Sequence, residues 1–154
     1  MIELKVTGTG LGSHHDLTDH IARALAEHGA GDGLAGVFAH GSTVGLTVMR
    51  YEPGAVRDLL TVLDRLAPDS PDAGARYLHE LTTGDPNGSA HLKSSLLGTS
   101  LLVPFTAGAL AMSPTHRVVL FDFDFLPATR RILIDLPRPA SPRAGHPTGK
   151  ENVQ

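Results

Sequence analysis

The chain has 154 residues, a formal net charge of −3 and no cysteine. Its length predicts one domain with a buried hydrophobic core, and the lack of cysteine excludes disulfides, thiolate metal sites and cysteine nucleophiles. The mild negative charge and the absence of tryptophan predict no nucleic-acid partner. No apolar run is long enough to span a membrane and no signal-peptide pattern is present, which predicts a cytoplasmic protein without a membrane partner.

The first part of the chain predicts strands interleaved with two helices. Asp16 is suited to a helix N-cap, and Pro53 is suited to the first turn of a helix. Helical apolar periodicity follows each of these residues, while alternating or continuous apolar runs indicate strands. We predict strands over residues 2–9, 33–39 and 44–51, and helices over 17–28 and 54–66.

The last third of the chain predicts mainly strands. They are expected over residues 100–105, 117–125 and 130–136, with a short apolar piece at 109–112. Combined with two to three helices, these strands predict an α+β fold with a mixed, largely antiparallel β-sheet structure. Residues 1–136 form the predicted single domain, and the tail 137–154, which is poor in apolar residues, is predicted to be disordered.

The stretch 87–100 has the strongest local signal. Ser89 is the predicted N-cap of a helix, and Gly98 is suited to the position just past its end. Helix N-termini attract anions, so the polar face of this helix predicts a site for a phosphorylated or anionic ligand. The alternative is an amphipathic helix with a solvated polar face. Helical spacing puts Leu92 and Leu96 on one face and His91, Ser94 and Ser95 on the opposite face, with Lys93 nearby.

Histidine is unusually frequent, with nine residues. His79 and His91 flank a polar loop, so their rings can converge and begin a metal site. A third ligand would come from His40, His116 or a carboxylate. The alternative for His40, which follows a predicted strand, is a structural or solvated turn histidine. Three further histidines near a helix start are interpreted as surface residues, namely His14, His15 and His20.

Several separate motifs, in a fixed order, are together similar to one protein family. They are His40-Gly41-Ser42-Thr43, Tyr51-Glu52-Pro53-Gly54 with Asp58, Tyr77 with His79, Asn87-Gly88, His91-Leu92-Lys93-Ser94-Ser95-Leu96-Leu97-Gly98, residues 100–105 and Phe123-Asp124. On these motifs the chain resembles the YjbQ family, often described as secondary thiamine-phosphate synthases. The resemblance covers roughly residues 3–136.

The resemblance implies a compact α+β subunit that forms a homotrimer, with a histidine-lined pocket at the subunit interface. It also implies thiamine-phosphate synthase activity, which joins a pyrimidine diphosphate to a thiazole phosphate and releases pyrophosphate. In such a site His79 and His91 are the expected catalytic residues, and His40, His79 and His91 are the expected ligands of a divalent metal ion. The expected ligand-binding residues are Ser42, Thr43, Asp58, Asn87, Lys93 and Ser94.

The chain departs from the family pattern at two places. Arg50 stands where related sequences usually have Glu, and Ser113-Pro114-Thr115-His116 replaces a Gly-Thr-Trp-Gln signature. Two hypotheses follow. The chain is either an enzyme with residual or altered transferase activity, or a diverged trimeric paralogue that binds a metal or a small phosphorylated ligand without turnover. The departures favour the second hypothesis, whereas the retained histidines favour a site that still binds a ligand.

Overall fold

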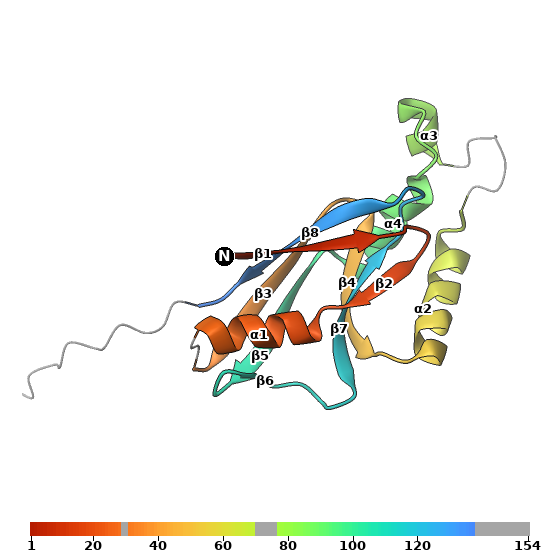
Figure 1. Cartoon of the computed structure of the whole chain (residues 1–154). Helices are drawn as coiled ribbons and strands as arrows, with labels where there is room; N and C mark the ends of the chain where they lie inside the picture. Colours follow the sequence, from red (N-terminus) through yellow and green to blue (C-terminus); the bar gives the residue numbers. More distant parts are fainter. Residues whose placement is uncertain (29–30, 70–76, 138–154) are drawn as a thin grey trace, which may run out of the picture.

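The computed structural model describes residues 1–28, 31–69 and 77–137, so the predicted disordered tail lies outside the described residues apart from Pro137. The described part contains two antiparallel sheets and four helices (Figure 1). The strands are β1 (Ile2–Gly8), β2 (Ser13–Asp16), β3 (Gly33–His40), β4 (Val44–Arg50), β5 (Ser100–Thr106), β6 (Ala109–Leu110), β7 (His116–Asp122) and β8 (Ala128–Asp135). The helices are α1 (Thr18–His28), α2 (Pro53–Leu66), α3 (Leu78–Thr83) and α4 (Gly88–Leu97).

The strands form one five-stranded sheet, in the order β1-β8-β3-β5-β6, and one three-stranded sheet, in the order β2-β7-β4. Every strand pair within the described residues is antiparallel. The predicted α+β class is therefore confirmed. Strand β2 was missed, because its four residues Ser13–Asp16 have no apolar alternation.

The main hydrophobic core lies between the two sheets and also includes α1. In β3, for example, Val37 and Ala39 are buried, whereas Phe38 between them is exposed. Strand periodicity puts alternate residues on opposite faces, which explains this pattern. Burying each large aliphatic side chain of this core contributes about 1.5–3 kcal/mol. The core includes Ile21, Leu25, Val37, Leu46, Leu120, Ile132 and Ile134.

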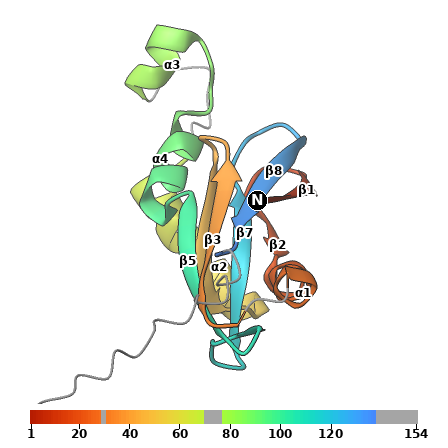
Figure 2. The same cartoon turned by 90° about the vertical axis from the view of Figure 1, so that its left-hand side faces the viewer.

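A second, smaller core lies on the other face of the three-stranded sheet. Phe121 and Phe123, which follow the opposite alternation to Leu120, pack there with side chains of α2 and α4. Helices α2 and α4 thus form a third layer, on the side of the strands away from α1 (Figure 2). Their contributions to this core are Val56, Leu63 and Ala90.

The structure corrects the prediction for the helix around residue 90. Helix α4 begins at Gly88 after Asn87, and Ser89 is fully buried, so the predicted N-cap at Ser89 is wrong. Its end at Gly98 is as predicted. The predicted faces are also only partly right, because Leu92 is 45% exposed and Ser94 only 3%, whereas Ser95 is exposed as expected.

The cause of this difference is close packing of α4 on β4. A Cβ atom on Gly45 would lie 2.8 Å from Cβ of Leu97, so the strand meets the helix almost backbone to backbone. Ser94 Oγ donates a hydrogen bond of 2.6 Å to the Val44 carbonyl oxygen. Small residues and Lys93 therefore form the buried face of α4, while Leu92 and Leu96 point outward.

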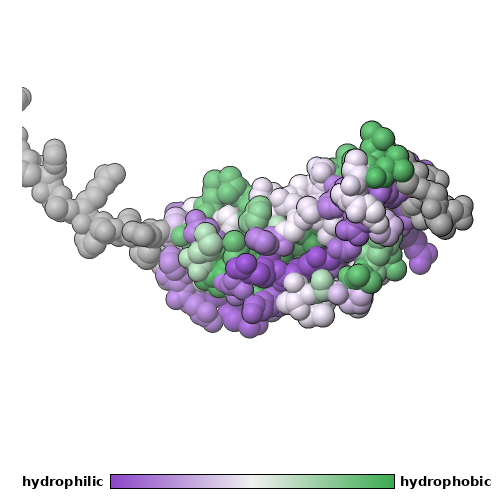
Figure 3. Space-filling view, turned by 90° about the horizontal axis from the view of Figure 1, so that it is seen from above, coloured by the Kyte–Doolittle hydropathy of each residue, from purple (hydrophilic) through white to green (hydrophobic). Residues whose placement is uncertain are grey.

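Exposed apolar side chains are found on the outer face of the five-stranded sheet and on helix α3. The outer face of the five-stranded sheet carries Phe38 and Leu102, which are 41% and 70% exposed. Helix α3 stands off the body and carries Leu78 and Leu81, which are 79% and 69% exposed (Figures 1 and 3). Clusters of exposed apolar residues on a protein surface mark interaction sites.

Candidate histidine-pair site

The rings of His79 and His91 lie against each other at the junction of α3 and α4. Their centroids are 4.5 Å apart and their planes are inclined by 64°. Helix α3 ends at Gly84, whose φ of 77° lies in the left-handed region, and the chain then turns into α4. The two rings thus converge across the polar loop that separates them in the sequence.

Each ring has one nitrogen fixed by a hydrogen bond. His91 Nδ1 lies 3.0 Å from the carbonyl oxygen of Ser42, which only accepts, so Nδ1 carries a proton. His79 Nε2 lies 3.0 Å from Oδ1 of Asn87 and carries a proton for the same reason. The remaining nitrogens, His91 Nε2 and His79 Nδ1, can accept a proton or donate to an anion once protonated.

The turn that contains Ser42 joins β3 to β4, and hydrogen bonds between Thr43 and the segment after β7 hold it in place. Thr43 is 4% exposed, and its hydroxyl donates a hydrogen bond of 3.0 Å to Asp124 Oδ2. The backbone nitrogen of Phe123 donates to the Thr43 carbonyl oxygen at 2.9 Å. These bonds hold the turn, and with it the hydrogen-bond acceptor of His91.

Arg130 also supports this turn, because it binds Asp124, the hydrogen-bond partner of Thr43, and the neighbouring Asp122. Arg130 donates through Nε and Nη2 to both carboxylate oxygens of Asp122, each at 2.8 Å, and through Nη2 to Asp124 at 3.2 Å. Burial alone would raise the pKa of Asp124. Hydrogen bonds from Thr43, the Phe125 amide and Arg130 outweigh burial and lower the pKa of Asp124 below its ordinary value.

An open pocket of about 640 Å³ adjoins the histidine pair. His40, Ser42 and His91 line it together with Phe38 of the outer sheet face. His40 is exposed at the end of β3. The pocket thus joins the histidines to the exposed apolar surface.

The family model described as UPF0047 protein YjbQ-like matches residues 2–138. The chain belongs to the YjbQ family. A UPF0047 protein of Archaeoglobus fulgidus is 34% identical over 119 residues, which cover 77% of this chain and 86% of that one. A solved structure of a conserved hypothetical protein from Thermus thermophilus is 32% identical, with a TM-score of 0.73, and covers 89% of this chain and 100% of that one. A YjbQ/UPF0047-family structure from Clostridium acetobutylicum is 27% identical, with a TM-score of 0.75 and coverages of 88% and 98%.

The predicted resemblance to the YjbQ family is therefore confirmed. In this YjbQ-family chain, no helix of the described residues is long and apolar enough to cross a membrane. The sequence match and the fold both show that the chain belongs to this family. Any activity has to be inferred from the residues of the site.

Lys93, a predicted ligand-binding residue of this YjbQ-family chain, is paired with two carboxylates. Its ammonium group lies 2.6 Å from Asp64 and 2.8 Å from Asp69, and its side chain is 6% exposed. Burial lowers the pKa of Lys93, but these two carboxylates outweigh burial and raise it. Ser89 also donates to Asp69, at 2.7 Å. No sequence pattern indicated this cluster, because its members are far apart along the chain.

The other predicted ligand-binding residues are placed unequally. Ser42 and Asn87 contact the histidine pair directly. Thr43 donates a hydrogen bond to Asp124, and Ser94 donates one to the Val44 carbonyl oxygen. Asp58 is exposed on α2 and is not among the residues that line the histidine pocket.

The described residues of one chain do not bring a full set of metal-binding side chains together. Among residues 1–28, 31–69 and 77–137, no three His, Cys, Asp or Glu side chains lie close enough to hold one metal ion. His40 shares the pocket with His91 but does not complete such a group with His79. Two imidazoles alone fall short of the ligand number that transition metals require. The donors of the described residues of one chain therefore do not by themselves make up a complete metal site.

The departures from the family pattern lie far from the histidine pair in this chain. Arg50 pairs with His116 in the β4–β7 ladder, so the two changes are neighbours. The turn at Thr43 is at the opposite end of β4, about 20 Å away along the strand. Within one subunit, these changes leave the surroundings of His79 and His91 intact.

Proposed function

We propose that the His79–His91 pair binds a small phosphorylated ligand. The observation that supports this proposal is the packing of two imidazole rings against each other, with their centroids 4.5 Å apart. In each ring one nitrogen is hydrogen-bonded to the protein and the other is left for a ligand. A nearby phosphate favours the protonated form of histidine, and each imidazolium then donates a charged hydrogen bond. His40 lines the adjoining pocket together with His91, so it adds a further imidazole beside the pair.

The same site suits transferase chemistry of the thiamine-phosphate synthase type. In that reaction the ring nitrogen of a thiazole phosphate forms a bond to the methylene carbon of a pyrimidine diphosphate, and the carbon–oxygen bond to pyrophosphate breaks. The developing charge is on the leaving pyrophosphate, so imidazolium donors from His79 and His91 would stabilise it. This proposal assigns roles only to the two histidines, because the described residues of one chain gather no third metal-binding side chain beside them.

We further propose that the protein is a homotrimer whose contacts lie beside this site. Phe38 belongs both to the exposed outer sheet face and to the histidine pocket, so a second copy on that face would also border the pocket. Leu92 and Leu96 of α4 extend the apolar surface. A neighbouring copy would enclose the open pocket and bring further side chains to it, including any third ligand for a metal.

Calorimetric titration with thiamine phosphate and with pyrophosphate tests the binding proposal. We expect binding by the wild type and a loss of about tenfold or more in affinity in His91→Ala, because a charged hydrogen bond is removed. His20→Ala, an exposed position on α1, serves as the matched control and should bind as the wild type does. Equal binding by His91→Ala and the wild type would overturn the assignment.

A product assay separates the two functional hypotheses. The wild type and His79→Ala are incubated with the pyrimidine diphosphate and the thiazole phosphate, and thiamine phosphate is measured. Turnover in the wild type that is lost in His79→Ala supports the transferase. Ligand binding without turnover supports the non-catalytic paralogue. Metal analysis and sedimentation of the same samples report the metal content and the oligomeric state.

A further inference from the structure

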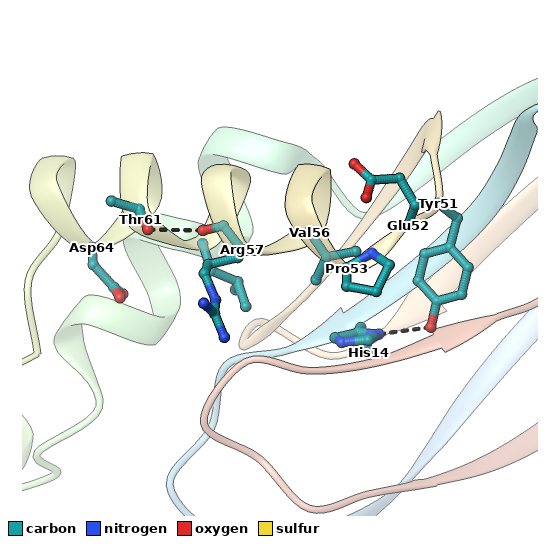
Figure 4. A pocket seen from close by; sticks show the side chains of 9 residues that line it. His14, Tyr51, Glu52, Pro53, Val56, Arg57, Thr61 and Asp64 are labelled. Carbon is teal, nitrogen blue, oxygen red and sulfur yellow. Dashed lines mark hydrogen bonds between the residues drawn. The ribbon is translucent and has the colours of Figure 1, made fainter.

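A second pocket, of about 550 Å³, lies between α2 and the edge strand β2 (Figure 4). Its lining residues are entirely different from those of the histidine pocket. Pockets that bind small molecules in proteins have volumes of about 300–1,000 Å³. The size therefore suits a ligand with a single ring or a short branched chain.

The wall of this pocket is mostly apolar. The ring of Tyr51, the ring of Pro53 and the side chains of Val56 and Leu60 line it. Rings at such a surface are stabilised by burial and by edge or offset contacts with Tyr. The apolar wall thus selects an aromatic or branched aliphatic body.

His14 and Tyr51 provide hydrogen-bonding groups at one end of the pocket. His14 Nδ1 and the Tyr51 hydroxyl share a hydrogen bond of 2.7 Å, and their ring centroids are 5.4 Å apart. Burial, and secondarily His15, lowers the pKa of His14. Burial, and secondarily Asp16, raises the pKa of Tyr51. At neutral pH the pair therefore offers hydrogen bonds and no charge.

Arg57 is the group that gives the pocket its charge preference. Among the described residues it has no ion-pair partner, and Figure 4 shows its guanidinium reaching from α2 into the pocket. The two carboxylates of the lining are already engaged. Glu52 accepts from the Gly54 and Ala55 amides at 2.8 and 2.6 Å, and Asp64 accepts from Lys93 at 2.6 Å.

We propose that this pocket binds a small monocarboxylate with an aromatic or branched aliphatic body. The carboxylate pairs with the planar guanidinium of Arg57, which matches carboxylate geometry. The body lies on Tyr51, Val56 and Leu60. A doubly charged phosphate is repelled more strongly than a monocarboxylate, because two acidic residues, Glu52 and Asp64, are in the same lining.

The test is titration of the full chain with phenylacetate and with its neutral analogue phenylacetamide, followed by NMR of the histidine rings. We expect phenylacetate to bind about tenfold more tightly than the amide, because only the acid pairs with Arg57. Its addition should shift the ring resonances of His14 and leave those of His79 and His91 in place. Shifts at His79 and His91 instead would overturn the assignment.

Two substitutions on the same helix sharpen the test. Arg57→Gln should weaken phenylacetate binding by about tenfold. Arg65→Gln, also exposed on α2 but outside the pocket lining, should leave it unchanged. Equal effects of the two substitutions would overturn the proposal, as would displacement of phenylacetate by equimolar inorganic phosphate.

Discussion

Two ion-pair clusters each contain one buried charge, and they are built in opposite ways. In one, Asp122 is fully buried and Arg130, 12% exposed, neutralises it. In the other, Lys93 is 6% exposed, but its partners Asp64 and Asp69 are 60% and 44% exposed. The first cluster therefore contains a carboxylate that depends on one cation. The second contains a cation whose partners can return to water if it is lost.

The largest effect is expected from removing the cation of the first cluster. Arg130→Leu leaves Asp122 buried without a counter-charge, so we expect a loss of about 3–5 kcal/mol in the free energy of unfolding. Urea denaturation measures it. Arg131→Leu is the control, because Arg131 pairs with Glu3 at the surface, where ion pairs contribute little to stability. Similar losses in both variants would remove the contrast between buried and exposed pairs.

A smaller loss is expected one layer closer to the histidines. Thr43→Val keeps the shape of the side chain but removes the donor to Asp124, at an expected cost of about 1–2 kcal/mol. Because Thr43 also orients the turn that carries the Ser42 carbonyl, thiamine phosphate binding should weaken by several-fold as well. Unchanged binding with reduced stability would show that the turn holds His91 without this hydroxyl.

Removing the cation of the second cluster should cost least. Lys93→Met replaces the buried stem with an apolar side chain of similar length and leaves only exposed carboxylates behind. We expect a change of about 1 kcal/mol or less in the free energy of unfolding. A loss as large as that of Arg130→Leu would contradict the difference between the clusters.

Acid titration sharpens the comparison further. The pKa of Asp124 is lowered in the folded state, so its contribution is present above the ordinary carboxyl range and is lost as the pH falls through the folded pKa. The stability difference between the wild type and Thr43→Val should therefore be largest near neutral pH and shrink as the pH falls below about 4. A difference that stays constant to about pH 2 would exclude the Thr43–Asp124 bond as its source.

Periodicity was sufficient for much of the fold and for one feature of the site. The apolar stripe and Pro53 located α2, and Asp16 was correctly expected at the start of α1, where it accepts from the Thr18 amide at 2.8 Å. The convergence of His79 and His91 followed from the loop between them. These features depend on residues close together in the sequence.

The failures have a common physical cause. The buried face of α4 was misassigned because helix spacing does not reveal that Gly45 allows the strand to approach. The role of Lys93 was missed because its partners are 24 and 29 residues away. The pairing of His14 with Tyr51 spans 37 residues. Tertiary contacts of this kind decide which polar groups are engaged and which remain for a ligand.

The way α3 stands off the body has a kinetic consequence. Of its six residues only Glu80 is buried, so detaching α3 exposes little apolar surface that was hidden before. Segments with few buried contacts open locally at a free energy well below that of global unfolding. The backbone amides of α3 should therefore exchange with deuterium much faster than those of β7. A ligand that contacts both His79 and His91 would lose its contact with His79 whenever α3 detaches, with the two sheets still folded.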